Sequence, residues 1–257
     1  MNKSYKILVT GGCGSIGQQI CKNLHEKGHA VTCFSRNPTC NSAIKGDITN
    51  YKLISENINL FDGVIHAAAA KNGKSSKEII ETNIIGTHNI LECGKDLKFI
   101  KLISSSEAYS QINKVYGTSK LLAEELTKNY PNAFFIRIPT VLGSKQGFIN
   151  KWIDDAKTKK EINLYLFNGI PKKKFFMTLS EAGIVCSILE KKQDINYRII
   201  DAGLVAKAIK DLIGCKIIEI QQSGENYEMI SETISSENKT AISYEETKLI
   251  LRKNYAI

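Results

Sequence analysis

Residues 5–17 are YKILVTGGCGSIG, a short apolar run followed at once by glycines at 11, 14 and 17. A short run of aliphatic and β-branched residues is typical of a strand that is covered on both faces. Glycine at 11 permits a tight turn, glycine at 14 lets the backbone approach a phosphate, and glycine at 17 allows a helix to pack closely on the strand. The stretch therefore predicts a strand, a phosphate-binding loop and the N-terminus of a helix.

The alternative explanation of this loop is an ordinary turn at the start of a helix. The order of strand, loop and helix favours a dinucleotide-binding loop instead, because free N–H groups and the positive end of the helix dipole would face the pyrophosphate. The residues predicted to contact the dinucleotide here are Gly11, Gly14, Ser15, Ile16 and Gly17.

The same alternation continues through the first half of the chain. Short apolar runs predict strands over residues 5–9, 30–34, 63–67, 99–103 and 134–138, and helical spacing predicts helices over 16–27, 75–94 and 113–129. Strands that alternate with helices imply an α/β fold, a doubly wound parallel sheet of the Rossmann type. From about residue 145 the elements become shorter and more polar. We therefore predict a dinucleotide-binding domain over 1–145 and a small C-terminal substrate-binding lobe over 146–257, with some elements returning to the main body.

Composition narrows the class of protein. The 257 residues are 42% hydrophobic and 24% charged, which is ordinary for a globular protein, and no apolar run is long enough to span a bilayer. The chain passes from its first residues straight into the predicted strand, so no signal peptide is expected. Seven scattered cysteines without a CxxC pair suit a reducing compartment and predict neither a disulfide framework nor a metal site. We expect a cytoplasmic protein.

The formal charge of +9 raises the question of a nucleic-acid partner. The basic residues are mostly dispersed, and the one cluster, at 172–174, has no interleaved aromatic residues on which bases would stack. Neither a nucleic acid nor a membrane is therefore predicted as a partner. A basic surface also suits an anionic small substrate such as a nucleotide.

The end of the second predicted strand bears on the choice of dinucleotide. NAD-binding proteins usually place Asp or Glu about 20 residues after the glycine loop, where it binds the ribose hydroxyls. This chain has Ser35 and Arg36 there, a hydroxyl and a guanidinium that suit a 2′-phosphate. The competing explanation is that Arg36 is a solvated surface charge. We predict NADP as the cofactor, with NAD as the alternative.

A second polar stretch, SSSEAYSQINKVYGTSK at residues 104–120, follows a predicted strand and runs into a predicted helix. Tyr116 and Lys120 are four residues apart and so share one helix face. A tyrosine hydroxyl has a pKa of about 10, which a neighbouring ammonium and an oxidised nicotinamide would both lower. Ser105, at the end of the preceding strand, can hydrogen-bond a substrate oxygen. These groups predict hydride transfer between a nicotinamide and a carbinol or ketone carbon, with Tyr116 moving the hydroxyl proton.

Several segments together carry a resemblance to a known family. TGGCGSIG (10–17), HAAAA (66–70), ETNIIGTHNIL (81–91), SSSEAY (104–109) and YGTSK (116–120) resemble the extended short-chain dehydrogenases/reductases of the NAD-dependent epimerase/dehydratase type. The resemblance implies a UDP-, dTDP- or GDP-linked sugar as substrate. Members often pair through the helix that carries the tyrosine and lysine, so it also suggests a homodimer.

Later segments narrow the resemblance. FSRN (34–37), KKFFMTLSEA (173–182) and SGENYEMISE (223–232) are similar to segments of the 4,6-dehydratases of bacterial polysaccharide biosynthesis, a group that includes the inverting UDP-N-acetylglucosamine enzymes.

The resemblance also implies roles for individual residues. Ser105, Tyr116 and Lys120 would be the catalytic trio, and Ser105 is chosen among three serines because it lies four residues before Tyr109. Asn83 matches an asparagine that the family places near the tyrosine–lysine pair. The residues implied to hold the cofactor, besides the glycine loop, are Ser35, Arg36, Asp47, Ile48, Ala67, Ala68, Lys120, Pro139 and Thr140.

The active-site stretch departs from the dehydratase pattern. A 4,6-dehydratase needs a base for the C5 proton and an acid for the C6 hydroxyl, which that group supplies just after the catalytic Ser or Thr. Here those positions hold Ser106 and Glu107, so the acid is missing while a candidate base remains. Glu107 has an equal alternative role, capping the local backbone or pairing with a lysine. Lys174 replaces an arginine of the family, which removes a bidentate grip on phosphate or sugar.

The leading hypothesis is therefore an NADP(H)-dependent enzyme that transfers hydride at C4 of a nucleotide-linked hexose, as a 4-keto-sugar reductase or a 4-epimerase. The alternative is a 4,6-dehydratase in which Glu107 is the catalytic base. A third hypothesis is a dinucleotide-binding regulator without catalysis, which ranks last because such proteins usually lose the Tyr–Lys pair that this chain keeps. Packing roles are expected for His66 and Trp152.

Overall fold

The computed structural model describes residues 3–39, 43–71, 73–108, 114–144, 147–167, 169–171, 173–191, 197–222, 239–255 and 257. The chain divides into two compact units, Met1–Ile138 with Ser180–Gln193 and Pro139–Leu179 with Asp194–Ile257. Tyr109, Lys172 and the segment 223–232, which the sequence singled out, lie outside the described residues. The roles assigned to residues 1–145 and 146–257 stay predictions.

Within the described residues, the first unit is built on a parallel six-stranded sheet in the order β3-β2-β1-β4-β5-β6. The strands are β1 (Lys6–Thr10), β2 (Ala30–Ser35), β3 (Ile44–Lys45), β4 (Gly63–His66), β5 (Phe99–Ser105) and β6 (Ala133–Ile138). The chain moves outward from β1 to β3 and then outward in the other direction from β4 to β6, so β1 and β4 flank the switch point. This order confirms the predicted doubly wound fold. The short β3 was not predicted, because two residues are too few to show a strand pattern.

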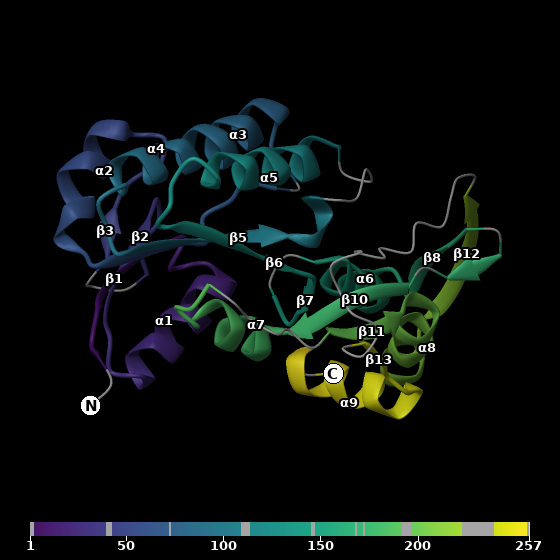
Figure 1. Ribbon diagram of the computed structural model, residues 1–257. Helices are drawn as coiled ribbons and strands as arrows, with labels where there is room; N and C mark the ends of the chain where they lie inside the picture. The colour runs from purple at the N-terminus through teal and green to yellow at the C-terminus, as the bar shows by residue number, and fades with distance from the viewer. Residues whose placement is uncertain are drawn as a thin grey trace. The chain divides into compact units, whose positions relative to one another are not determined.

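Helices cover both faces of this sheet (Figure 1). One face carries α2 (Tyr51–Asn57), α3 (Ser76–Ile80), α4 (Gly86–Cys93) and α5 (Lys114–Thr127), and the other carries α1 (Ser15–Glu26) and α7 (Leu179–Cys186). Short turns complete the unit: η1 (Ile58–Leu60), η3 (Ser106–Ala108) and the π turn η2 (Glu81–Ile85). The predicted helix over 75–94 therefore exists, with a π turn in its middle. Among the helices in the described ranges, none has the length and apolarity needed to cross a membrane.

A buried lysine attaches α7 to the first unit. Lys101 on β5 is fully buried, and its Nζ donates to the carbonyl oxygens of Val185 at 3.0 Å and Ile188 at 2.8 Å, at the C-terminal end of α7. A cation at a helix C-terminus is favoured by the helix dipole. Gly183 lies so close to α1 that a Cβ there would be 2.4 Å from the Cβ of Gln19. Residues 183–188 thus pack on α1 and β5 of the first unit, although they follow part of the second unit in sequence.

The second unit contains shorter elements around its own core. Its strands are β7 (Thr140–Leu142), β8 (Glu161–Phe167), β9 (Ile170–Pro171), β10 (Lys173–Thr178), β11 (Tyr197–Asp201), β12 (Lys216–Gln222) and β13 (Lys239–Ala241), and its helices are α6 (Phe148–Thr158), α8 (Ala202–Ile213) and α9 (Tyr244–Tyr255). The strands form sheets in the orders β13-β11-β10-β7 and β12-β8-β9.

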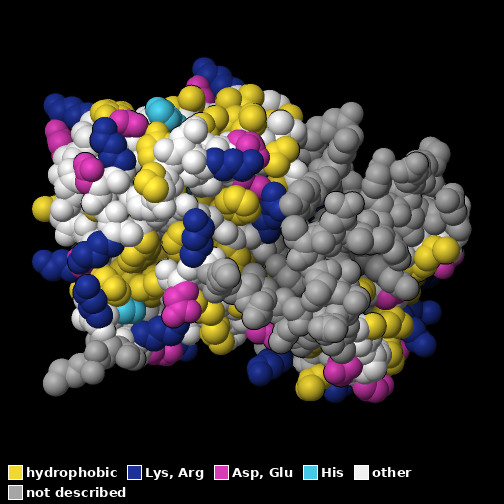
Figure 2. All heavy atoms as spheres, viewed as in Figure 1, with side chains coloured by type: hydrophobic (Ala, Val, Ile, Leu, Met, Phe, Trp, Pro, Cys, Tyr) yellow, Lys and Arg dark blue, Asp and Glu magenta, His cyan; other side chains and the backbone are white. Residues whose placement is uncertain are grey.

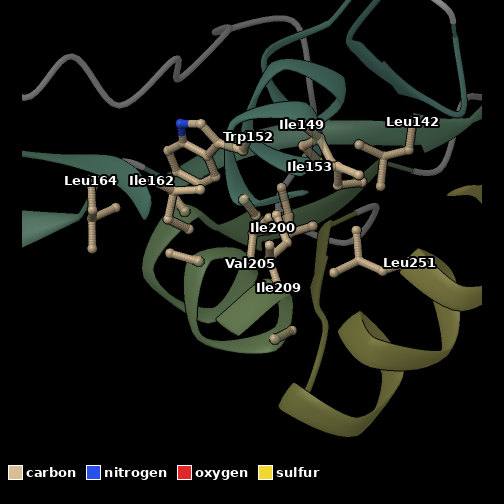
Figure 3. Packing of buried hydrophobic residues seen from close by; sticks show 14 of the residues in the cluster. Leu142, Ile149, Trp152, Ile153, Ile162, Leu164, Ile200, Val205, Ile209 and Leu251 are labelled. Carbon is tan, nitrogen blue, oxygen red and sulfur yellow. The ribbon is translucent and has the colours of Figure 1, made fainter. Parts of the chain in front are cut away.

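The core of the second unit packs these helices on the two sheets. Figure 3 shows Trp152 and Ile153 of α6 near Val205 and Ile200, with Leu251 of α9 on the other side. The Trp152 ring makes an edge-on contact with Phe148 at 5.2 Å between ring centroids. Trp152 is therefore a packing residue, as expected from the sequence.

Candidate functional site

The glycine loop joins β1 to α1 by backbone contacts that exclude side chains. Gly11 has φ +68°, and a Cβ on it would lie 2.7 Å from the backbone N of Ala68. A Cβ on Gly17 would lie 2.1 Å from the carbonyl oxygen of Gly11. Gly14 is the N-cap of α1 and places no side chain over the start of the helix, where Ser15 and Ile16 form the first turn. The backbone before the N-terminus of α1 carries no side chains at these glycines, so an anion can approach the helix N-terminus closely. This geometry suits a pyrophosphate.

The tip of β2 carries an ion pair. The Arg36 Nη1 atom lies 3.8 Å from Asp47 Oδ2, and both side chains are substantially exposed, so the pair contributes little stability. Asp47 Oδ1 also accepts hydrogen bonds from the backbone N–H and the hydroxyl of Thr49 at 3.0 and 2.9 Å. The structure thus places together Ser35, Arg36 and Asp47, with Ile48 buried next to them.

The loop after β4 is hydrogen-bonded to the end of β1. Ala67 N donates to the Thr10 carbonyl at 3.0 Å, and Ala68 N lies 3.5 Å from Thr10 Oγ1. Because Ala68 also touches Gly11, Ala67 and Ala68 lie against the glycine loop. These two predicted cofactor residues are therefore brought next to the predicted phosphate site.

His66 is a neutral core residue. Its Nδ1 is 2.6 Å from Thr10 Oγ1 and its Nε2 is 3.1 Å from Thr87 Oγ1. Thr87 uses its proton to donate to the Asn83 carbonyl at 2.7 Å, so Nε2 of His66 is the protonated nitrogen and Nδ1 accepts from Thr10. Burial and the charge of Lys120 lower the pKa of His66 to about 3. His66 is thus packed in the core, as expected.

Asn83 extends this network to α5. Its side chain forms a pair of hydrogen bonds with the backbone of Ala70, accepting at 2.7 Å and donating at 2.9 Å, and also donates to Ser119 Oγ at 2.9 Å. Ser119 in turn donates to the Tyr116 carbonyl at 2.7 Å. Asn83 lies in the π turn η2, a feature often found at functional sites. We call Thr10, His66, Thr87, Asn83 and Ser119 the neutral network.

The catalytic candidates meet at the C-terminal end of β5. Ser105 is the last residue of β5, and its side chain lies near enough to Tyr116, which is 6% exposed, to lower the pKa of the tyrosine. The Glu107 N–H, in the turn that follows, donates to Ser105 Oγ at 3.2 Å. Lys120 is 2% exposed, and its Nζ donates to the Ile103 carbonyl at 2.7 Å. The structure therefore brings together Ser105, Tyr116 and Glu107, with Lys120 one turn along α5.

The electrostatics of the pair differ from the sequence-based expectation. Burial and the charge of Glu107 raise the pKa of Tyr116, and the hydrogen bond from Ser105 only partly opposes them. The lowering expected from the Lys120 ammonium together with an oxidised nicotinamide stays a prediction, and in the chain by itself desolvation is the larger effect. Burial lowers the pKa of Lys120 to about 8, while the charge of Glu124 acts to raise it.

Sequence reasoning missed a cation and a buried ion pair. Lys71 Nζ, from the loop after β4, lies 5.9 Å from the centroid of the Tyr116 ring. Glu124 forms a bidentate pair with Arg137 of β6, with Nε to Oε1 at 2.8 Å. No local pattern marks Lys71, whereas the spacing of Glu124, four residues after Lys120 on one helix, was a signal that the sequence contained.

Two predicted residues lie in the second unit. Pro139 follows β6 directly, and Thr140 begins β7, where it pairs with Phe176 of β10. Their predicted contact with a nicotinamide stays a prediction. The side chain of Lys174 lies outside the described residues.

A family model described as the NAD dependent epimerase/dehydratase family matches residues 7–193. The chain belongs to this family. The match begins in β1, and so includes the glycine loop, β5 and the Tyr–Lys helix.

Curated relatives are longer than this chain. The chain is 26% identical to UDP-glucose 4-epimerase of Rickettsia canadensis, over 82% of this chain and 71% of that protein. It is 35% identical to an uncharacterized membrane protein of Methanocaldococcus jannaschii over 144 residues, 49% of this chain and 43% of that protein. The chain thus matches less than half the length of the archaeal relative.

Solved structures share the fold. Pen from Bacillus thuringiensis aligns with a TM-score of 0.81 at 23% identity, covering 99% of both chains. WbmG of Bordetella bronchiseptica, solved in complex with NAD and UDP, aligns with a TM-score of 0.70 at 16% identity, covering 96% of this chain and 88% of that one.

Apolar side chains are exposed on the helices next to the site. Figure 2 shows hydrophobic side chains over α3 and α5 at the top of the view. The exposed apolar residues of these helices and of η2 are Ile80, Ile85, Val115, Leu121 and Leu122. A cluster of this kind on one face is typical of an interaction surface.

Proposed function

We propose that this protein binds a nicotinamide dinucleotide and a nucleotide-linked hexose and transfers hydride at C4 of the sugar, as a 4-epimerase or a 4-keto-sugar reductase. The observation that carries the proposal is the burial of Tyr116 beside Ser105 at the end of β5, with the buried Lys120 on the same helix. Membership of the epimerase/dehydratase family supports the cofactor and the substrate class. In this proposal the substrate binds to residues 146–257.

The residues at the switch point fit a dinucleotide. The close backbone contacts of Gly11 and Gly17 leave the N-terminus of α1 open to a pyrophosphate, and Ala67 and Ala68 lie next to it. When bound, the nicotinamide supplies hydride acceptance and return, and its oxidised ring brings a positive charge. The resemblance alone assigns Pro139 and Thr140 to the nicotinamide end.

The chain's own residues would handle the proton of the sugar hydroxyl. Ser105 Oγ accepts from the Glu107 N–H, so its own proton is available to donate to the sugar oxygen or to Tyr116. Tyr116 would take or return the hydroxyl proton. The ammonium groups of Lys120 and Lys71 favour the tyrosinate form, against the burial that raises the pKa of Tyr116.

Turnover assays separate the two versions of the proposal. An epimerase interconverts UDP-glucose and UDP-galactose without net oxidation of the cofactor, whereas a reductase oxidises NADPH when given a UDP- or dTDP-4-keto-6-deoxyhexose. In either case Tyr116→Phe lowers kcat by about 10²–10⁴-fold, because the proton acceptor is lost. A protein that binds a dinucleotide but turns over neither substrate class, and in which Tyr116→Phe has no effect, would favour the third hypothesis. That hypothesis is a dinucleotide-binding regulator without catalysis.

A second candidate function is a 4,6-dehydratase. The observation that favours it is Glu107, whose charge reaches Tyr116 and whose turn is hydrogen-bonded to Ser105. A dehydratase takes up solvent deuterium at C5 of the sugar and releases water without net use of cofactor. Glu107→Gln would abolish deuterium uptake, and full activity in that variant would reject Glu107 as the base.

We propose NADP as the preferred dinucleotide, with Arg36 as its 2′-phosphate ligand. No carboxylate follows β2 at the position usual for NAD, and Asp47 holds the Arg36 side chain at the edge of the sheet. Arg36→Ala should raise the Kd for NADP by about tenfold or more, because charge-assisted hydrogen bonds are lost, while the Kd for NAD changes little. Equal effects on both dinucleotides, measured by fluorescence titration, would remove Arg36 from this role.

We also propose that the exposed apolar residues of α3 and α5 support a homodimer. Leu122→Glu would place a charge in that surface and should produce a monomer in sedimentation velocity runs. A wild-type protein that is already monomeric at high concentration would rule out this dimer.

A further inference from the structure

A carboxylate is buried beneath the catalytic candidates, outside the roles proposed above. The Glu124 side chain is 1% exposed. It receives hydrogen bonds from Ser104 Oγ and from the Nε and Nη2 atoms of Arg137, the Nε contact being 2.8 Å. We call Ser104, Glu124 and Arg137 the ionic network.

The ionic network touches the catalytic residues on three elements. Ser104 directly precedes Ser105 at the end of β5, and its register partner on β6 is Arg137. Glu124 follows Lys120 by one turn of α5. Because Ser104 and Arg137 are neighbours across the two strands, a single carboxylate on α5 can bind both. The network therefore fixes the helix that carries Tyr116 and Lys120 against the strand end that carries Ser105.

Stability alone is a weak reason for this arrangement. Taking a carboxylate and a guanidinium out of water costs free energy, and apolar replacements of similar volume are often neutral or stabilising. Lys120 offers a second reason for a buried carboxylate at this place. Lys120 is itself buried, and its hydrogen bond within the described residues is to a neutral carbonyl oxygen. Glu124 is the acidic group whose charge acts on it.

We propose that Glu124 is a positioning residue that supplies the buried counter-charge of Lys120 and holds α5 in register with Ser105 through Ser104 and Arg137. The catalytic part of this inference rests on the proposed function, whereas the counter-charge does not. Without Glu124, Lys120 keeps its place on α5 but loses the charge that favours its ammonium form.

Other charged groups surround this pair. Arg137 on β6 binds the carboxylate. Burial raises the pKa of Glu124 to about 7, against the hydrogen bond from Ser104 and the charge of Lys120, which lower it. His66 on β4 faces Lys120 and is neutral above a pKa of about 3. On the surface side of α5 lie Glu125 and Lys128, which pair with each other. Glu124 therefore becomes ionised as the pH rises through about 7, and Lys120 loses its proton at a higher pH, near 8.

A direct test measures the titration of Lys120 by NMR on protein with labelled lysine ε-carbons, using Lys120→Met to assign the signal. We expect a midpoint near pH 8 in the wild type and a downward shift of about one pH unit or more in Glu124→Gln, because an opposite charge is removed. Glu125→Gln is the matched control, since it removes the same charge one residue along and leaves the midpoint unchanged.

Glu124→Gln removes the carboxylate that Arg137 binds, which lowers the stability of the variant. Glu124→Gln with Arg137→Met removes both charges and provides the second variant. Because Arg137 carries the opposite charge, the double variant is compared with Arg137→Met, and the Lys120 midpoint should be lower in the double variant if Glu124 acts on Lys120 directly. Equal midpoints in these two variants would overturn the counter-charge.

The catalytic part is tested by the pH dependence of kcat/KM. The alkaline limb should lie at lower pH in the double variant than in Arg137→Met, by the same shift as the Lys120 midpoint, while Glu125→Gln keeps the wild-type profile. An active wild type with the same alkaline limb in Arg137→Met and in the double variant would reject the catalytic role and leave the proposed function standing. A wild type without turnover would reject the proposed function, and the NMR titration would still decide on the counter-charge.

Discussion

The neutral network and the ionic network both end on α5, but the first contains no ionised group and the second is built around a carboxylate and a guanidinium. The neutral network runs from Thr10, before the glycine loop, to Ser119. The ionic network ties β5 and β6 to Glu124. The first thus reaches the predicted cofactor loops, and the second reaches the predicted catalytic groups.

The difference in charge makes the two networks respond differently to change. A neutral member that is removed leaves one or two hydrogen-bonding groups without partners, which costs about 1–3 kcal/mol. An ionic member that is removed leaves a buried charge, which costs about 3–5 kcal/mol. A fall in pH, in contrast, should affect the neutral network more than the ionic network. His66 is buried in its neutral form, and an added proton disrupts its hydrogen bonds.

The largest expected effect comes from breaking the ionic network. Arg137→Met leaves the buried Glu124 carboxylate without its bidentate partner, with the Ser104 hydrogen bond remaining, and should lower the free energy of unfolding by about 3–5 kcal/mol in urea titrations at neutral pH. The double variant Glu124→Gln with Arg137→Met should recover a large part of this loss. Equal losses in the single and double variants would mean that packing of Arg137 on Phe135, and not charge, is the main contribution.

The next effect is a pH dependence that comes from the neutral network. The pKa of His66 is about 3 when folded and about 6.5 when unfolded, so the unfolded state binds more protons below pH 6.5. The contribution of neutral His66 to the free energy of unfolding is complete above pH 6.5 and decreases as the pH falls toward 3. Between pH 7 and pH 5 the wild type should lose about 2 kcal/mol more than His66→Gln. His88→Gln, at an exposed position, is the matched control and should keep the wild-type slope.

The smallest effect is expected at the end of the neutral network. Ser119→Ala removes a hydroxyl that binds Asn83 and the Tyr116 carbonyl, but Asn83 keeps both hydrogen bonds to Ala70. The free energy of unfolding should fall by about 1 kcal/mol. A loss as large as that of Arg137→Met would contradict the distinction between the two networks.

Local sequence patterns predicted most of the elements that form the first unit. The glycine loop, five strands and three helical regions were predicted in the observed order, because each has a periodicity or a glycine requirement of its own. The π turn within residues 75–94 was not predicted, since it follows the same spacing of apolar residues as an α-helix. The two-residue β3 has too few residues for a pattern.

The candidate site was predicted only where its residues are close in sequence. Tyr116 and Lys120 share a helix face, and Ser105 ends the strand before it, so their meeting followed from short spacing. Lys71 comes from a different loop, and its position near Tyr116 depends on how β4 lies next to β5. The burial that raises the pKa of Tyr116 could not be predicted from the sequence, because burial is a property of the folded chain.

The sequence by itself determined a doubly wound sheet, a glycine cradle at the end of β1 and a Tyr–Lys pair on one helix face. Those features depend on residue types at short, regular spacing. Only the tertiary structure decided that Ser104 and Arg137 are register partners, that Glu124 binds both, and that Asn83 holds the backbone of Ala70. These contacts join residues 13 to 33 positions apart in the sequence, and they form because buried polar groups must find partners wherever the packed elements place them.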